Sequence, residues 1–325
     1  MGTTFNQGSS ANYTNDNRQQ TADALFTENN ITTSDNNIID ISDLSINELW
    51  HLQYEQEKSF ANLIKKADPF SLERGILMKN GYETINKLMK MRSSKEGKIL
   101  SSYGASDSYG KLVEKIVRKS LRKKSECLFF EAGVGTGKII TAIANIKNVC
   151  AIGCDVYVDR DFIRSDLTVY ECTIYEALEK LEDNSIDVFY WNDVMEHIPE
   201  DEIESYIEIL ASKMNIGGVI ITITPNRLKG PCDITSHFEP HGTIAKGFHF
   251  HEYTFYEIIT LFKKYDIKSS YGFLGYARKG WYILGSSKVI DKIKFVLEKA
   301  IAKFPYLLRK ILITIMGCDV SILKK

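Results

Sequence analysis

Short runs rich in β-branched and aromatic residues alternate with amphipathic helical runs from residue 127 onward, and this alternation predicts an α/β protein with a mostly parallel sheet. Helices between successive strands provide the right-handed crossovers that parallel strands need. The last two expected strands form a hairpin at the sheet edge. The expected strands span residues 128–132, 149–155, 167–172, 186–191, 219–224, 269–274 and 281–285. We therefore expect a Rossmann-like, seven-stranded sheet with flanking helices.

Segments of different composition flank that sheet domain. Residues 1–42 are rich in Asn, Thr, Ser and Gln, offer little apolar surface, and are expected to form a disordered polar tail. Residues 43–100 carry two amphipathic patterns and should form an N-terminal helical segment, whose first helix ends near Lys66. The sheet domain then occupies residues 101–287, and a basic amphipathic segment covers residues 288–325.

Composition excludes several functional classes. The 41 basic and 42 acidic side chains leave no excess positive charge to attract nucleic acid, so we expect no nucleic-acid partner. Cys150 and Cys154 share one expected strand without a second pair at zinc-finger spacing, so we expect reduced core cysteines and no zinc site. The N-terminus shows no basic region followed by an apolar one, which predicts a cytoplasmic location.

A glycine-rich loop directly follows the first expected strand and opens a helix. Its glycines, Gly133, Gly135 and Gly137, lie where an α/β sheet binds ligands and where a bare backbone can approach a ligand closely. A phosphate-binding loop would need a glycine at Ala132 and a hydroxyl side chain at Ile139, so this interpretation fails. A dinucleotide fingerprint would need its third glycine three residues beyond the second, where the chain has a lysine.

An acidic residue, Asp155, ends the second expected strand. Its carboxylate can accept hydrogen bonds from both hydroxyls of a ribose, and the alternative is a helix cap. The order acid-x-Gly-x-Gly-x-Gly, followed by this second acid, resembles class I S-adenosylmethionine (SAM)-dependent methyltransferases. The resemblance implies SAM as the cofactor, with Glu131 near its methionine end. Many family members place an Asp beside adenine after the third strand; here Thr173 and Ile174 stand there, so we expect backbone contacts instead, or ordinary strand-end residues.

The fourth expected strand runs into residues 192–197, which resemble the fourth-strand motif of ubiquinone- and menaquinone-biosynthesis methyltransferases. The resemblance implies that Asn192 lies at the cofactor and His197 near the reaction centre. The motif differs from the Asn-Pro-Pro-Tyr form that methylates nucleic-acid bases. On one helix face, Asp193, Glu196 and His197 would resemble a cluster that binds a divalent metal in some quinone O-methyltransferases. We favour the alternative, a helix cap lining the cofactor pocket, and expect no metal.

A long loop after the fifth strand, residues 225–254, holds most of the histidines. Methylation of a hydroxyl requires loss of its proton, and histidine is the usual acceptor near neutral pH. We expect His237 or His249 to be the general base, with His197 as the third candidate. The alternative for each is a loop or packing residue.

Residues 224–228 and 247–254 resemble methyltransferases associated with bacterial surface-polysaccharide and glycan biosynthesis. The resemblance implies a sugar acceptor that Asn226, Arg227 and Lys229 would bind, the two cations through a phosphate or carboxylate; the alternative is a solvated basic turn. We therefore expect in-line methyl transfer from SAM to a sugar hydroxyl. Other hypotheses are a quinone-like or other small-molecule acceptor and a non-catalytic SAM-binding partner subunit.

The C-terminal residues 288–325 carry nine Lys/Arg and three Asp/Glu around an apolar stripe. Pro305 should interrupt the helix, and residues 304–316 are too short to span a bilayer. The basic amphipathic pattern of residues 288–316 predicts either peripheral contact with the inner face of an anionic membrane or docking on the chain's own domain or a partner.

Overall fold

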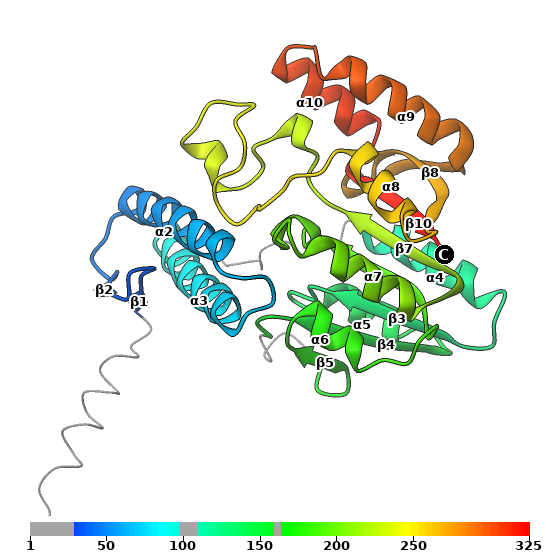
Figure 1. Ribbon diagram of the computed structural model, residues 1–325, viewed down its shortest axis with the longest axis horizontal. Helices are drawn as coiled ribbons and strands as arrows, with labels where there is room; N and C mark the ends of the chain where they lie inside the picture. Colours follow the sequence, from blue (N-terminus) through cyan, green and yellow to red (C-terminus); the bar gives the residue numbers. More distant parts are fainter. Residues whose placement is uncertain (1–28, 98–108, 159–163) are drawn as a thin grey trace, which may run out of the picture.

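The computed structural model describes residues 29–97, 109–158 and 164–325 (Figure 1). Its largest element is an eight-stranded sheet in the order β5-β4-β3-β6-β7-β10-β8-β9. Strands β5, β4, β3, β6 and β7 are parallel, whereas β10 is antiparallel to both of its neighbours and β9 is antiparallel to β8. The strands are Cys127–Ala132 (β3), Val149–Asp155 (β4), Thr168–Glu171 (β5), Ile186–Asn192 (β6), Met214–Ile223 (β7), Lys268–Tyr276 (β8), Trp281–Ser286 (β9) and Val320–Lys324 (β10). The predicted α/β class with a mostly parallel, Rossmann-like sheet is confirmed.

The central strand β6 shows why the sheet has an apolar layer on each face. All of its residues except the last are buried. Phe189 and Trp191 belong to one apolar cluster, whereas Val188 and Tyr190 belong to the cluster on the opposite face. Continuous burial of this kind is typical of a parallel strand that helices cover on both sides.

Helices cover both faces of the sheet. Helices α6, α7 and α8 contribute to the cluster that contains Trp191, and α4 and α5 contribute to the cluster that contains Tyr190. The helices are Gly110–Leu121 (α4), Lys138–Ala144 (α5), Ile174–Glu179 (α6), Ile203–Lys213 (α7) and Phe255–Lys263 (α8). This arrangement leaves the carboxyl ends of the parallel strands open for a ligand.

The N-terminal segment forms a pair of helices beside the sheet domain (Figure 1). The helices are Ile46–Lys66 (α2) and Leu72–Lys95 (α3). Helix α2 begins at a capping box, in which the Ser45 hydroxyl accepts a hydrogen bond from Glu48 N and the Glu48 carboxylate accepts one from Ser45 N. It ends at Lys66, as the sequence predicted. The pair shares an apolar cluster with Phe248 and Phe250, so it packs against the loop that follows β7.

An ion pair also fixes this helical pair to the sheet domain. Arg74 of α3 lies 2.8 Å from Glu202, which precedes α7, and only 3% and 5% of these two residues are exposed. Arg74 also contacts the partly exposed Asp201 at 2.7 Å. The position of the helical pair therefore depends on a charge pair shielded from water.

The polar N-terminal tail is shorter than the sequence predicted. Two short strands, Asn30–Thr32 (β1) and Ile38–Asp40 (β2), form an antiparallel pair beside α3. Ile31 and Ile41 are buried in the apolar cluster of α2 and α3. The expected disorder is therefore wrong for residues 29–42, because packing against the helices buries two isoleucines of the tail. Residues 1–28 lie outside the described residues.

The C-terminal segment differs most from expectation. The predicted hairpin of β8 and β9 is present, but the final strand β10 lies between β7 and β8, so the sheet has eight strands rather than seven. Before it come two helices, Ser287–Ile301 (α9) and Tyr306–Ile315 (α10), which are separated at Pro305 as expected. Val320, Ile322 and Leu323 of β10 are almost fully buried. The end of the segment is thus part of the core.

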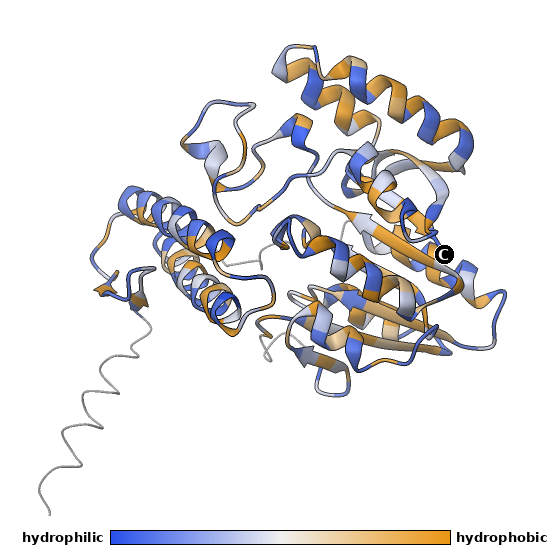
Figure 2. Cartoon of the chain, viewed as in Figure 1, coloured by the Kyte–Doolittle hydropathy of each residue, from blue (hydrophilic) through white to orange (hydrophobic). Residues whose placement is uncertain are grey.

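Helices α9 and α10 keep apolar side chains on the surface. Figure 2 shows apolar stretches along both helices. The exposed apolar residues are Val289, Ile293, Val296 and Leu297 on α9, Leu307, Leu308, Ile311 and Ile315 on α10, and Phe304 between them. Within the described ranges, every helix is too short or too polar to cross a membrane.

Candidate functional site

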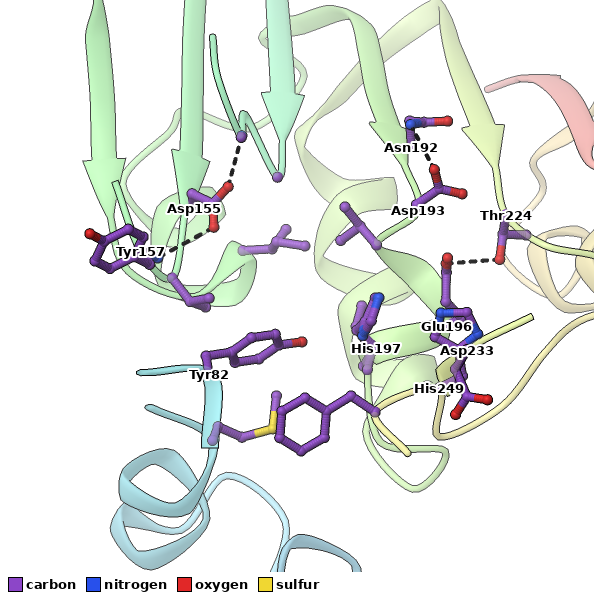
Figure 3. A pocket seen from close by; sticks show the side chains of 18 of the residues that line it. Tyr82, Asp155, Tyr157, Asn192, Asp193, Glu196, His197, Thr224, Asp233 and His249 are labelled. Atoms are coloured by element: carbon purple, nitrogen blue, oxygen red, sulfur yellow. Dashed lines mark hydrogen bonds between the residues drawn. The ribbon is translucent and has the colours of Figure 1, made fainter. Parts of the chain in front are cut away.

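A cavity of about 2080 Å³ lies at the carboxyl ends of β3, β4, β5, β6 and β7. Residues of α2 and α3 line its other side. Figure 3 shows that Asp155 lies at one end of this cavity, while Glu196, His197 and His249 gather at the other. The cavity therefore combines the ligand-binding edge of the sheet with a separate polar cluster.

The glycine loop takes the shape that its sequence predicts. Gly133, Gly135 and Gly137 have φ angles of +72°, +49° and +68°, in the left-handed region that side chains with a Cβ avoid. A Cβ on Gly133 would lie 2.4 Å from Cγ2 of Val194. Gly133 and Gly135 line the cavity, and Gly137 forms the N-cap of α5. The loop thus presents bare backbone to the cavity.

Asp155 holds this loop at the end of β4. Its Oδ2 accepts a hydrogen bond from Gly135 N at 2.9 Å, and its Oδ1 accepts one from Tyr157 N at 3.3 Å. Burial raises the pKa of Asp155, while the backbone donors oppose that shift. The carboxylate lines the cavity and retains lone pairs for further donors.

Glu131 is the second buried acid at the sheet edge. Only 4% of the residue is exposed, and burial raises its pKa well above the ordinary value. Among the described residues, no donor reaches its Oε2. A buried carboxyl oxygen without a donor typically costs about 1–3 kcal/mol, so a ligand donor in this part of the cavity would be stabilising.

The remaining residues expected at the cofactor also border the cavity. Thr173 caps α6: its hydroxyl donates a hydrogen bond to Glu176 Oε2 at 2.9 Å and accepts one from Glu176 N at 3.2 Å. Its side-chain oxygen is thus engaged, and Thr173 and Ile174 both line that part of the cavity. Asn192, at the end of β6, donates to Asp193 Oδ2 at 3.1 Å.

The turn after β6 does not place Asp193, Glu196 and His197 on one helical face. The segment Met195–His197 is a short 3-10 turn, and Asp193 itself has a φ of +53°. The Asp193 carboxylate instead forms an ion pair with Arg278 at 2.8 Å. The cluster considered from sequence is therefore not formed as such, because the backbone reverses at Asp193.

His249 of the long loop takes the third position in that cluster. Ligand atoms of Glu196, His197 and His249 lie within 4.8 Å of one another, and the two imidazole rings meet edge to face. Burial and the nearby His249 lower the pKa of His197 to about 3. Burial alone would lower the pKa of His249, but its hydrogen bond with Glu252 and the charge of Glu196 raise it to about 9. Neither pKa lies near neutrality, where a general base works best.

The other histidines of the loop lie apart from this cluster. His237 borders the cavity, where its ring packs 4.4 Å from that of Trp50 on α2. His241 stacks on Tyr306 with ring centroids 4.1 Å apart, and His251 packs on Tyr253. The structure thus brings His197 and His249 together and leaves His237 separate.

Two of the three residues expected to bind the acceptor are held elsewhere. Asn226 is fully buried and donates to Glu298 Oε1 at 2.8 Å, so it joins the loop to α9. Arg227 pairs with Glu257 at 2.8 Å and does not line the cavity. Lys229 does line it, but its ammonium group pairs with the Asp319 carboxylate. Ion pairs with Glu257 and Asp319 thus engage the two cations of this loop.

The wall formed by α2 and α3 could not be seen in the sequence. Trp50, Glu57 and Tyr82 belong to the apolar stripes of these helices, yet they border the cavity. Burial raises the pKa of Glu57 to about 7, and its carboxylate accepts a hydrogen bond from Gln53 at 2.7 Å. The sequence did carry a signal for this wall: Glu57 is an acidic residue among the apolar residues of α2, and acidic residues are seldom fully buried unless they are paired.

Comparison with known proteins finds solved structures that this chain resembles. The chain matches no family model and no curated protein. A SAM-dependent methyltransferase from Archaeoglobus fulgidus has 17% identity and a TM-score of 0.43, over 66% of this chain and 94% of that one. An O-methyltransferase family protein from Burkholderia thailandensis has 15% identity and a TM-score of 0.44, over 74% and 69%. Geranyl diphosphate C-methyltransferase from Streptomyces coelicolor has 10% identity and a TM-score of 0.40, over 81% and 86%.

Proposed function

We propose that this chain binds SAM at the carboxyl edge of its sheet and transfers the methyl group to an acceptor hydroxyl. The observation that carries this proposal is the glycine loop: its three glycines have left-handed φ angles, and Gly135 N donates a hydrogen bond to Asp155. A loop of this shape lets a ligand lie against backbone, and the carboxylate beside it suits two vicinal hydroxyls. An adenosyl group offers both features.

The remaining contacts of the cofactor follow from this placement. The ribose hydroxyls donate to Asp155, and the ammonium group of the methionine part donates to the unpartnered Oε2 of Glu131. Adenine lies beside the backbone of Thr173 and the side chain of Ile174, and Asn192 lies near the methionine part. In this arrangement the sulfonium methyl points towards the half of the cavity that contains Glu196.

The acceptor occupies that half of the cavity, between the cluster and the α2–α3 pair. Its hydroxyl oxygen attacks the methyl carbon in line with the C–S bond, the bonding pair returns to sulfur, and S-adenosylhomocysteine leaves. The hydroxyl proton is lost at the cluster of Glu196, His197 and His249. Two of the three histidines that the sequence predicted as general-base candidates therefore lie beside the reacting oxygen. His237 and Lys229 border the same space and would contact the rest of the acceptor.

We propose a sugar hydroxyl of a glycan under biosynthesis as the acceptor, on the sequence resemblance to glycan methyltransferases and on the polar side chains of Glu196, His197, His237 and His249 that border the cavity. The test is incubation with methyl-labelled SAM and separate acceptors: nucleotide sugars, a lipid-linked oligosaccharide and a quinol. Label on a sugar oxygen is expected. Label on the quinol would overturn the sugar assignment, and label on protein or nucleic acid would overturn the acceptor class.

We further propose that α9 and α10 hold the chain on an anionic membrane surface, at the inner face of a cytoplasmic membrane. Exposed residues at 289, 293, 296 and 297 form one apolar stripe on α9, and α10 repeats the pattern. Five lysines of residues 287–316 are exposed, and the two acids of the same segment are buried or half-buried. Apolar side chains ringed by exposed cations suit anionic headgroups above an acyl layer. The surface would bring a lipid-linked acceptor near the cavity.

Sedimentation with vesicles tests this surface. We expect the full chain to bind vesicles that contain phosphatidylglycerol, and the Leu307→Glu/Ile311→Glu variant to lose that binding. Ile216→Glu is the matched control, because Ile216 is 83% exposed on a different element. Equal sedimentation of the double variant and the wild type would contradict the proposal, as would a stable dimer in solution that these substitutions dissociate.

A further inference from the structure

The cluster of Glu196, His197 and His249 has the form of a ligand set. One nitrogen or oxygen from each side chain lies within 4.8 Å of the others. Ligands around one divalent first-row cation stand about 3–4.4 Å apart, since each bond is about 2.0–2.2 Å long. Small side-chain rotations would therefore bring the three atoms around a single ion. Two imidazoles and one carboxylate suit a first-row transition-metal cation better than magnesium, which prefers oxygen.

Two of the three side chains present buried ligand atoms that the described residues leave unused. In that part of the chain, Oε1 of Glu196 and Nδ1 of His197 are buried without a hydrogen-bond partner. Neither residue exposes these atoms to water, so an empty cluster holds polar atoms at a cost. A bound cation would satisfy both atoms at once.

Outer contacts orient two of the three ligands. Thr224 Oγ1 donates a hydrogen bond to Oε2 of Glu196 at 2.9 Å, which leaves Oε1 for a cation. Glu252 Oε1 lies 2.9 Å from Nδ1 of His249, which leaves Nε2 as the ring nitrogen for a cation. A carboxylate on the far nitrogen of a ligand histidine fixes its tautomer and makes it a better ligand. This second layer distinguishes the cluster from a chance group of polar residues.

Asp193 does not belong to the ligand set. Its carboxylate pairs with Arg278 at 2.8 Å, and Asp193 is not among the residues whose ligand atoms lie within 4.8 Å of one another. The carboxylate that a helical turn would have supplied is thus replaced by His249, which comes from the long loop after β7. Closing the site therefore depends on the fold of that loop.

We infer that Glu196, His197 and His249 bind one divalent transition-metal cation, which holds the acceptor hydroxyl of the proposed methyl transfer. All three residues border the cavity, so part of the coordination sphere faces the acceptor. The cation supplies a Lewis acid that lowers the pKa of a coordinated hydroxyl. The two imidazoles then serve as ligands in place of the general base expected from sequence, and the hydroxyl proton leaves to water in the cavity.

Titration of the full chain with Mn²⁺ tests the inference, after chelator treatment and in the absence of SAM. Calorimetry, together with the loss of the electron-spin resonance of free Mn²⁺, gives stoichiometry and affinity. We expect one site per chain, loss of binding in His249→Asn, and binding about 10- to 100-fold weaker in Glu252→Gln. His241→Asn is the matched control and should bind like the wild type, because the His241 ring stacks on Tyr306 and does not belong to the cluster. Absence of Mn²⁺ and Zn²⁺ binding to the wild type would overturn the inference, as would a loss in His241→Asn as large as that in His249→Asn.

The inference rests on the proposed function only for the role of the cation, so the two can fail separately. Calorimetry with SAM on the metal-free chain tests the cofactor site independently. SAM binding without Mn²⁺ binding would leave the proposed function standing and overturn the cation site. Mn²⁺ binding without SAM binding would do the reverse. Circular dichroism and the SAM affinity of His249→Asn show whether that variant has kept its fold.

Discussion

Replacement of Asp155 by alanine should weaken SAM binding more than any other single change at the cofactor end of the cavity. The carboxylate accepts hydrogen bonds from Gly135 N at 2.9 Å and from Tyr157 N at 3.3 Å, and in our proposal it also accepts the ribose hydroxyls. The substitution therefore removes a ligand contact and also releases the glycine loop. Asp155→Asn keeps an acceptor for Gly135 N and loses only the charge and one acceptor oxygen.

The magnitude follows from these contacts. A hydrogen bond to a charged group contributes about 1.5–3 kcal/mol, and Asp155→Ala removes two such bonds from the ligand. Incomplete additivity reduces the sum to about 3 kcal/mol, which corresponds to roughly 100-fold weaker binding. Asp155→Asn should weaken binding about 10-fold on the same scale. In the free chain, the loss of two backbone hydrogen bonds is opposed by the removal of a buried carboxyl whose charged form burial penalises.

Calorimetry with SAM and S-adenosylhomocysteine measures both effects, with thermal unfolding as the check on the fold. Asp183→Ala is the control, since Asp183 pairs with Lys213 and its side chain is 65% exposed. Its affinity should equal that of the wild type. The reasoning would be refuted if Asp155→Ala bound SAM within about threefold of the wild type, a difference of roughly 0.7 kcal/mol.

Three further predictions concern the framework of the site. In denaturant unfolding, Gly133→Ala should destabilise the chain by about 1–2 kcal/mol because of its left-handed φ, and by more because the new Cβ would contact Val194. Gly280→Ala is the control, because Gly280 has a similar φ of +75° but no described atom near its Cβ position. Equal destabilisation by the two substitutions would contradict the expected contact with Val194. Glu57→Gln should stabilise the chain by up to about 3 kcal/mol above pH 7, because the pKa of Glu57 is raised from 4.5 to about 7 and its charged form is penalised in the fold. That gain should vanish as the pH falls below about 4.5, where both states are protonated, and Glu55→Gln, at a side chain that is 60% exposed, is the surface control. Arg74→Ala should lower the free energy of unfolding by about 3 kcal/mol, because Glu202 stays buried without its partner. Adding Glu202→Gln should recover part of this loss. In the same assay, Lys58→Ala, which breaks an exposed ion pair, should cost less than about 1 kcal/mol.

Local patterns in the sequence predicted most of the fold. Strand β4 has the bounds predicted for it, and α2 ends at Lys66 as expected. Both are set by neighbours in the chain: the alternation of apolar runs, the capping residues and the glycines act over a few residues. The glycine loop and Asp155 belong to the same class, because a strand, a tight turn and a helix in succession fix their relative positions.

Tertiary packing decided the features that the sequence left open or predicted wrongly. The strand β10 enters the sheet between two earlier strands, and Ile31 and Ile41 order a tail that looks too polar to fold. Neither position has a local signal, since each depends on an apolar surface that distant segments create.

The cluster at the acceptor end shows the same division. The sequence by itself determined Glu196 and His197, which follow β6 directly, and it determined the glycine loop with its acid. Only the tertiary structure decided that Asp193 turns to Arg278 and that His249 completes the cluster. The physical reason is that backbone geometry within a strand and its turn is local, whereas the approach of a loop to that turn depends on the helices packed beneath it.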